Sequence, residues 1–320
     1  MSASRSSLVD VHAHFLTPEY VDAARAAGHE HPDGMPGWPN WHAREHVELM
    51  DRWGIGTSML SISSPGTHFG DDAAARALTR HVNDTAATIR AEHPGRFGHF
   101  ASLPLPDVDG ALAELVRALD ELGATGVTVE SNAHGRYLGD IRYEPLWAEI
   151  NHRRTPVFLH PTSPPHAEII ALGRPRPMLE FIFDTTRTVS DLVFAGVFQR
   201  CPDIPWIIPH GGGTLPLLAQ RLELFRTGLG TADRTGTPVP DQLAQLWFDL
   251  AGTPFPHQVS ALTSAFGTER ILYGSDYCWT PPALVDAQLA TIDDTWRALT
   301  TSNAHRLFGI MSPNRADARQ

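Results

Sequence analysis

The sequence contains no lysine, and all 25 of its basic residues are arginine. This absence excludes a lysine Schiff base, a P-loop lysine and a carbamylated lysine that bridges two metal ions. It leaves open a single metal ion held by histidine and aspartate. The two cysteines, Cys201 and Cys278, provide neither a disulfide framework nor the spacing of a zinc finger.

Membrane and nucleic-acid signals are also missing. No apolar run approaches the roughly 20 residues that a membrane span requires, and "MSASRSS" at the start has no apolar signal region. The net charge is −11, and the arginines are scattered singly rather than in a basic stripe. We therefore expect a cytoplasmic protein with neither a membrane nor a nucleic acid as partner.

Two Gly-rich motifs are absent. Without G-x-G-x-x-G there is no dinucleotide-binding fingerprint, and without G-x-S-x-G there is no serine nucleophile elbow. The run "HGGG" at 210–213 therefore has no esterase context. We expect its glycines to let the backbone pack closely.

Eight short apolar runs have the composition of buried strands. Helical patterns separate most of them, and such alternation is typical of a parallel sheet with helical crossovers. Eight repeats predict a single (β/α)8 TIM-barrel domain over residues 1–320, and an open doubly wound sheet is the alternative. Surplus segments predict insertions after strands 1, 5 and 6: a Gly/Pro/Trp-rich one at about 16–45, and two more around 162–185 and 227–242. The expected strands cover 8–15, 57–63, 97–103, 126–131, 156–161, 204–210, 246–252 and 270–276, and the expected helices cover 71–94, 108–123, 142–154, 214–226, 256–267 and 301–310.

The stretch "LVDVHAHF" contains His12 and His14 one residue apart. With 17 histidines in the chain, an H-x-H match carries little weight alone, and "HEH" at 29–31 is a second match without a strand pattern. Position separates the two matches. His12 and His14 lie on the first expected strand, where residues two apart point the same way.

Polar residues end three other expected strands: His160 the fifth, His210 the sixth and Asp276 the eighth. The carboxyl ends of barrel strands form the face where active sites are built. In a closed barrel the first and eighth strands are neighbours, so His12, His14 and Asp276 should converge, with His160 across the mouth. Three imidazoles and a carboxylate suit Zn²⁺ or a similar divalent ion such as Mn²⁺.

These motifs resemble the amidohydrolase superfamily, in its metal-dependent decarboxylase branch. The matching segments are "VDVHAHF", "FLHP", "PHGGGTLP" and "LYGSDY". The resemblance implies one divalent metal ion per chain on His12, His14, His160 and Asp276, with His210 beside it. The segments "PDGMPGWPNW", "SISSPGTHFGDD", "FASLPLPDVDGALAEL" and "HPTSP" look like 6-methylsalicylate decarboxylases. They imply removal of CO₂ from a small aromatic carboxylic acid, an ortho-hydroxybenzoate.

Asp276 is the expected acid that protonates the ring carbon, and His210 is expected to assist proton transfer. The same residues would also serve a hydrolase that attacks a lactone, ester or amide with a metal-activated water. A barrel that has lost catalysis is a third class, but it predicts a missing ligand. The resemblance further implies a homodimer or higher homo-oligomer in which Arg221 reaches a neighbouring site. The expected substrate contacts are Arg221, Trp38, Ser61 and Trp279, and further candidates at the mouth are Trp41, Arg44 and His68.

Overall fold

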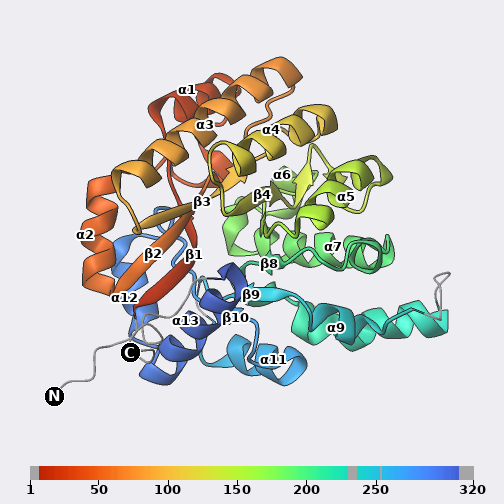
Figure 1. Cartoon of the computed structure of the whole chain (residues 1–320). Coiled ribbons are helices and arrows are strands. Elements are labelled where there is room, and N and C mark those ends of the chain that lie inside the picture. The colour runs from red at the N-terminus through yellow and green to blue at the C-terminus, as the bar shows by residue number, and fades with distance from the viewer. Residues whose placement is uncertain (1–6, 230–235, 253, 310–320) are drawn as a thin grey trace, which may run out of the picture.

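The computed structural model describes residues 7–229, 236–252 and 254–309. Eight parallel strands form one sheet in the order β1-β2-β3-β4-β7-β8-β9-β10, surrounded by helices (Figure 1). Bridges from Asp10 to Tyr273 and from Ala13 to Tyr277 join the two edges of the sheet. The predicted TIM barrel is confirmed. Its strands are β1 (Leu8–His14), β2 (Ile55–Ser61), β3 (Phe97–Ser102), β4 (Gly126–Glu130), β7 (Val157–His160), β8 (Trp206–Ile208), β9 (Trp247–Asp249) and β10 (Ile271–Leu272).

The strands are buried on both faces, as their continuous apolar runs require. One cluster, which includes Val11, Phe100, Phe158 and Trp247, fills the barrel interior. The C-terminal helix α13 (Asp294–Phe308) contributes Ala304 to that cluster. Two larger clusters pack the outer face of the sheet against the helices.

Each predicted helix is present; five have ends within three residues of the prediction, whereas the last begins at Asp294, seven residues earlier than expected. Aspartate side chains cap some of these helices. Asp71 accepts a hydrogen bond from Ala74 N–H at the start of α3, and Asp107 accepts one from Gly110 N–H at the start of α4. The predicted helices correspond to α3 (Asp72–Glu92), α4 (Val108–Asp120), α5 (Glu144–Arg153), α9 (Leu215–Leu224), α11 (His257–Phe266) and α13. No helix in the described residues is both long and apolar enough to cross a membrane.

The predicted insertions contain helices that the sequence patterns did not reveal. Residues 16–45 form α1 (Pro18–Ala26), the 3-10 turn η1 (Pro32–Gly34) and the start of α2 (Ala43–Trp53). The segment 162–185 contains α6 (Ala167–Ile170), η3 (Arg176–Met178) and the start of α7 (Glu180–Phe194). Of 227–242, residues 230–235 lie outside the described part, and the rest includes α10 (Val239–Leu243). A hairpin, β5 (Asn132–Ala133) with β6 (Arg136–Tyr137), and the helices α8 (Val197–Arg200) and α12 (Pro282–Leu289) complete the main elements.

A register shift in β1 places the two histidines. The pairing of β1 with β2 is irregular between Asp10 and Ala13. Val11 belongs to the interior cluster, and the next residue, His12, also packs its ring against Phe158 of that cluster, with centroids 4.9 Å apart. Two successive side chains therefore face the interior, because the bulge shifts the alternation by one residue.

Candidate metal centre

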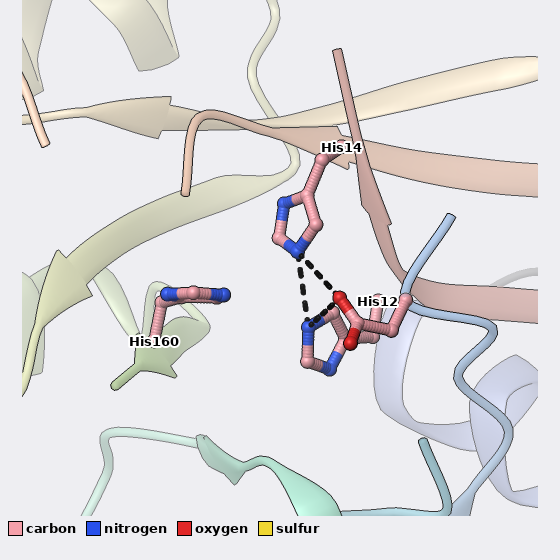
Figure 2. Close-up of side chains that lie close together, drawn as sticks. His12, His14 and His160 are labelled. Atoms are coloured by element: carbon pink, nitrogen blue, oxygen red, sulfur yellow. Dashed lines mark hydrogen bonds and ion pairs between the residues drawn. The ribbon is translucent and has the colours of Figure 1, made fainter. Parts of the chain in front are cut away.

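Four side chains converge where the strands end. His12, His14, His160 and Asp276 each offer a ligand atom, and these atoms all lie within 4.8 Å of one another. Figure 2 shows the three imidazoles turned toward one another from β1 and β7. Asp276 Oδ1 lies 3.5 Å from His12 Nε2 and 3.3 Å from His14 Nε2. All three histidines are buried. Because the ligand atoms converge, the structure brings together the predicted ligand set.

The hydrogen bonds of the imidazoles fit a bound cation. His12 Nδ1 lies 2.9 Å from the Asp249 carboxylate, and His14 Nδ1 lies 3.3 Å from the carbonyl oxygen of Ser61. Both partners accept hydrogen bonds, so both Nδ1 atoms carry a proton, and Nε2 is the atom that each ring offers to the ligand cluster. These two Nε2 atoms are only 3.1 Å apart. Two lone pairs at that distance repel unless a proton or a metal ion lies between them.

Each ligand histidine has a polar partner behind it. Asp249 faces His12, and the Ser61 hydroxyl lies 3.1 Å from His14 Nδ1. His160 Nδ1 accepts a 3.4 Å hydrogen bond from the Ser64 N–H, and Glu130 Oε2, which has no hydrogen-bond partner among the described residues, lies 3.5 Å from the same nitrogen. Such partners fix the orientation and tautomer of ligating imidazoles.

The pKa values in the cluster favour a cation at its centre. Burial raises the pKa of Asp276, but hydrogen bonds with His12 and His14 outweigh burial and lower that pKa well below its usual range. Burial and the neighbouring charges of His14 and His12 lower the pKa of His160 well below its usual range, so this ring is neutral. Burial lowers the pKa of His12, yet the Asp249 and Asp276 charges raise it to about 10. The carboxylates therefore create a field that attracts positive charge.

The two candidate catalytic residues occupy unusual backbone conformations. His210 has φ +54° and Asp276 has φ +58°, and residues other than glycine rarely adopt this region of backbone conformation. Hydrogen bonds hold both: His210 N–H donates to Asp249, and Asp276 N–H donates to the His12 carbonyl. His210 Nε2 lies 3.8 Å from Asp276 Oδ2, and its Nδ1 has no hydrogen-bond partner in the described residues.

The cluster opens into a cavity of about 560 Å³, which we call the metal chamber. His160, His210 and Asp276 lie in its lining, as does the Trp279 indole. Most of the other walls are apolar and come from Met35, Pro177, Met178, Phe181, Ile182 and Leu284. An apolar chamber with a few convergent polar groups suits a small, largely hydrophobic ligand.

The predicted substrate contacts have different places in this geometry. Trp279 lines the metal chamber and donates a 2.6 Å hydrogen bond to the Ser63 hydroxyl. Trp38 packs behind Trp279, with ring centroids 5.6 Å apart, and lies outside the lining. Ser61 is buried against His14, so its visible role is to orient a ligand. A direct substrate contact by Trp38 or Ser61 stays a prediction.

Arg221 lies on α9, exposed to solvent, with its guanidinium 5.2 Å from the centroid of the Phe225 ring. It lies outside the lining of the metal chamber of its own chain. Arg44 is 90% exposed and pairs with Glu48. The Trp41 indole donates to His46, and His68 faces a different cavity.

Sequence reasoning missed Asp249 and Glu130. Asp249 ends β9 and contacts both His12 and the backbone of His210, and Glu130 ends β4 beside His160. Each is a lone carboxylate at the end of an apolar strand. Because a carboxylate is costly to bury alone, its position at a strand end is a usable signal of a functional partner.

Comparisons with known proteins agree with this site. An amidohydrolase family model matches residues 9–310. The 6-methylsalicylic acid decarboxylase of Aspergillus aculeatus is 35% identical over 280 residues, which span 84% of this chain and 83% of the relative. A solved amidohydrolase II structure has a TM-score of 0.88 at 33% identity, covering 95% of this chain and all of the other. A 2,6-dihydroxybenzoate decarboxylase solved with 2,6-dihydroxybenzoate has a TM-score of 0.82 at 25% identity, with 95% and 100% covered. The chain therefore belongs to the amidohydrolase family, and within it to the metal-dependent decarboxylases.

Proposed function

We propose that this protein removes CO₂ from 6-methylsalicylate or a closely similar ortho-hydroxybenzoate. The observation that carries the proposal is the placement of Asp276, a carboxylate of the ligand cluster that also lines an apolar chamber. Such a chamber accommodates an aromatic ring, and the polar cluster at its floor accommodates the carboxylate and phenol oxygens. The decarboxylase relative with 35% identity supports this substrate class.

We propose one divalent metal ion per chain on His12, His14, His160 and Asp276, with zinc preferred and manganese as the alternative. Nitrogen and oxygen ligands suit both ions. When bound, the ion would supply positive charge for the substrate carboxylate and phenol oxygen and would orient them.

Asp276 moves the proton in the proposed reaction. Its carboxylate is ionised, so it first accepts the phenolic proton of the substrate and then donates it to the ring carbon that bears the carboxylate. The ring loses aromaticity at this step. The bond to the carboxylate then breaks, its electron pair returns to the ring, and CO₂ leaves. The phenolate product takes a proton from solvent.

His210 and the chamber walls assist this transfer. The His210 imidazole faces Asp276 Oδ2 at 3.8 Å, where it can orient the carboxylate or exchange a proton with it. Phe181 and Trp279 cover the chamber with aromatic surface and limit access of water to the protonated ring.

We also propose that two chains associate and that Arg221 serves the site of the neighbouring chain. Exposed apolar side chains support this interface: Leu172 is 84% exposed, Leu217 on α9 is 74% exposed, and Leu284 lines the chamber while remaining 58% exposed. Exposed apolar side chains mark an interaction site where they form one patch. The dimer, the role of Arg221 and a cytoplasmic location stay predictions.

A substrate panel tests the proposed reaction. Metal-loaded protein should release CO₂ and m-cresol from 6-methylsalicylate, while lactones, esters and amides should remain intact. Turnover of a lactone, ester or amide with inert hydroxybenzoates would contradict the proposal and favour a hydrolase.

A further inference from the structure

A second cavity, of about 680 Å³, opens at the same end of the barrel. We call it the outer chamber. It lies over the ends of β3 and β4, where Leu103 and Val129 line it, and beside the β5–β6 hairpin, which contributes His134. None of the four metal ligands lines it, and neither does His210. The reaction proposed above therefore leaves this cavity without a role.

Arg176 is the only arginine among the described residues that line either chamber. No carboxylate in the described part of the chain lies within ion-pair distance of it, and the Asp33 carboxyl interacts with its charge at longer range. Its Nε atom is buried and has no hydrogen-bond partner there. A buried, unpartnered guanidinium nitrogen is costly, and a carboxylate ligand would satisfy it with a charge-assisted, bidentate contact.

The backbone holds this guanidinium against the chamber wall. The η3 turn, which begins at Arg176, packs against η1. A Cβ atom at Gly34 in η1 would lie 2.6 Å from Arg176 Nη1, and Gly34 has φ +76°. Glycine at this position therefore satisfies the turn and also leaves space for the arginine.

The two chambers adjoin at Asp33, which lines both. Its Oδ1 accepts a 2.5 Å hydrogen bond from the Ser163 hydroxyl. Beside it, the hydroxyls of Ser64 and Thr162 are 2.7 Å apart. The η3 turn spans the same boundary, since Arg176 lines the outer chamber and Pro177 lines the metal chamber. A thin polar wall therefore separates Arg176 from the reaction site.

The walls of the outer chamber indicate which class of anionic ligand would fit beside Arg176. Apolar surface comes from Leu103, Leu105 and Val129, and from the rings of Pro65 and Pro164. A small inorganic anion would leave this surface in contact with water, whereas an aromatic ring would cover it. The lining also contains the carboxyl groups of Asp33, Glu130 and Glu168, and Arg176 is its one guanidinium among the described residues. A guanidinium beside apolar walls suits an aromatic monocarboxylate.

We propose that the outer chamber is a second binding site for a small aromatic carboxylate, with Arg176 pairing its carboxylate group. The choice of an aromatic acid rests on the proposed function, but the site itself does not require decarboxylation. Because it adjoins the metal chamber, it can hold a second molecule of substrate close to the reaction site.

Calorimetric titration of the metal-loaded protein with benzoate tests the proposal. Benzoate lacks the ortho-hydroxyl on which the proposed reaction depends, so binding is measured without turnover. We expect two benzoate sites in the wild type, and Arg176→Gln should weaken one of them at least 10-fold. The matched control is Arg174→Gln, since Arg174 is exposed and lines neither chamber. A crystal soaked with 4-bromobenzoate should show bromine in the outer chamber.

A second variant keeps the test independent of Arg176. Ala133→Phe would fill the outer chamber from β5 and should remove the same benzoate site, provided that the melting temperature is unchanged. Benzoate binding that Arg176→Gln does not weaken, whether at one site or at two, would overturn the proposal. Binding of bicarbonate but not benzoate at Arg176 would overturn the aromatic assignment. Failure to decarboxylate 6-methylsalicylate would contradict the proposed function and leave the benzoate result intact.

Discussion

At the scale of single residues, Asp276 combines two roles. Its Oδ1 faces His12 and His14 in the ligand cluster, and its Oδ2 faces His210 and accepts a 3.3 Å hydrogen bond from Thr280. The positive φ of Asp276 places the carboxylate between these groups. One side chain therefore connects metal binding with proton transfer.

The variant Asp276→Asn should lose most activity, because an amide cannot carry the proton to the ring carbon. General acid–base catalysis contributes about 10²–10⁴-fold, so kcat for CO₂ release should fall by at least that factor. Metal content, measured on the same samples, separates loss of the acid from loss of the ion. The control Asp203→Asn alters an exposed carboxylate and should be unaffected. Activity near the wild-type level in Asp276→Asn would rule out its role as the acid.

Asp249 should act through His12. The variant Asp249→Asn removes the charge behind His12 Nδ1 while preserving the shape of the side chain. Loss of such a partner costs about 10–100-fold in metal affinity. Competition with a chelator measures this change directly. Unchanged metal affinity would show that the contact with His12 has no influence on the ion.

The sequence predicted the metal ligands because each lies on or shortly after a recognisable apolar strand, although β10 ends at Leu272, four residues before Asp276. It did not predict the contacts of Asp249 with His12 or of Glu130 with His160, since each pair comes from strands that are distant in sequence. It also did not reveal that Ser61 faces His14, because that contact depends on the register between β1 and β2. Roles that arise from pairing across strands require the three-dimensional structure.

At the scale of secondary-structure elements, β3 contains a buried histidine, His99, from which we expect the fold to be sensitive to acid. Both ring nitrogens of His99 lack hydrogen-bond partners in the described residues. Burial, assisted by the nearby Arg90 charge, lowers the pKa of His99 to about 4. The ring therefore stays neutral in the folded protein at pH values where the unfolded chain binds a proton.

This difference predicts the direction of the pH dependence. The unfolded state binds more protons than the folded state between pH 6.5 and 4, so the free energy of unfolding decreases as pH falls. The full shift corresponds to about 3 kcal/mol. Urea unfolding at a series of pH values should show a shallower slope for His99→Gln than for the wild type. Equal slopes would mean that His99 does not contribute to acid sensitivity.

The helix α7 is an element that the pattern of apolar residues in the sequence did not predict. Its inner face buries Asp184, Thr185 and Thr188, so apolar residues alone do not mark it. Asp184 accepts hydrogen bonds from Ser131 and Asn132, which explains the polar face. The eight strands were predictable because burial on both faces leaves a continuous apolar signal. The bulge in β1 was not predictable, because a register shift between strands leaves no signal in the pattern of apolar residues.

At the scale of the whole molecule, the metal chamber opens at the mouth of the barrel, and large apolar side chains are exposed on α7 and α9. These exposed side chains add to the family resemblance as a reason for expecting a second chain. The barrel itself followed from the alternation of elements along the sequence. The two chambers could not be predicted in this way. Parts of their walls come from insertions, and the conformation of these insertions depends on contacts between them, such as the contact between η1 and η3.

If Arg221 serves the neighbouring site, Arg221→Ala should raise KM for the acid by about 10–100-fold, the size of a lost charge-assisted hydrogen bond. Metal content should not change, and Arg80→Ala on the exposed face of α3 is the control. Mixing Arg221→Ala with Asp276→Asn should restore activity, since a mixed dimer contains one complete site. No restoration despite exchange of subunits would place Arg221 outside the reaction.

The central claim is that a metal-dependent site protonates the ring carbon from which CO₂ leaves. The most direct measurement follows 6-methylsalicylate by NMR in D₂O with the metal-loaded protein. We expect m-cresol with one deuterium between the hydroxyl and the methyl group, and no product after chelation until a divalent ion is restored. Unchanged 6-methylsalicylate, or deuterated m-cresol formed equally fast after chelation, would contradict the account.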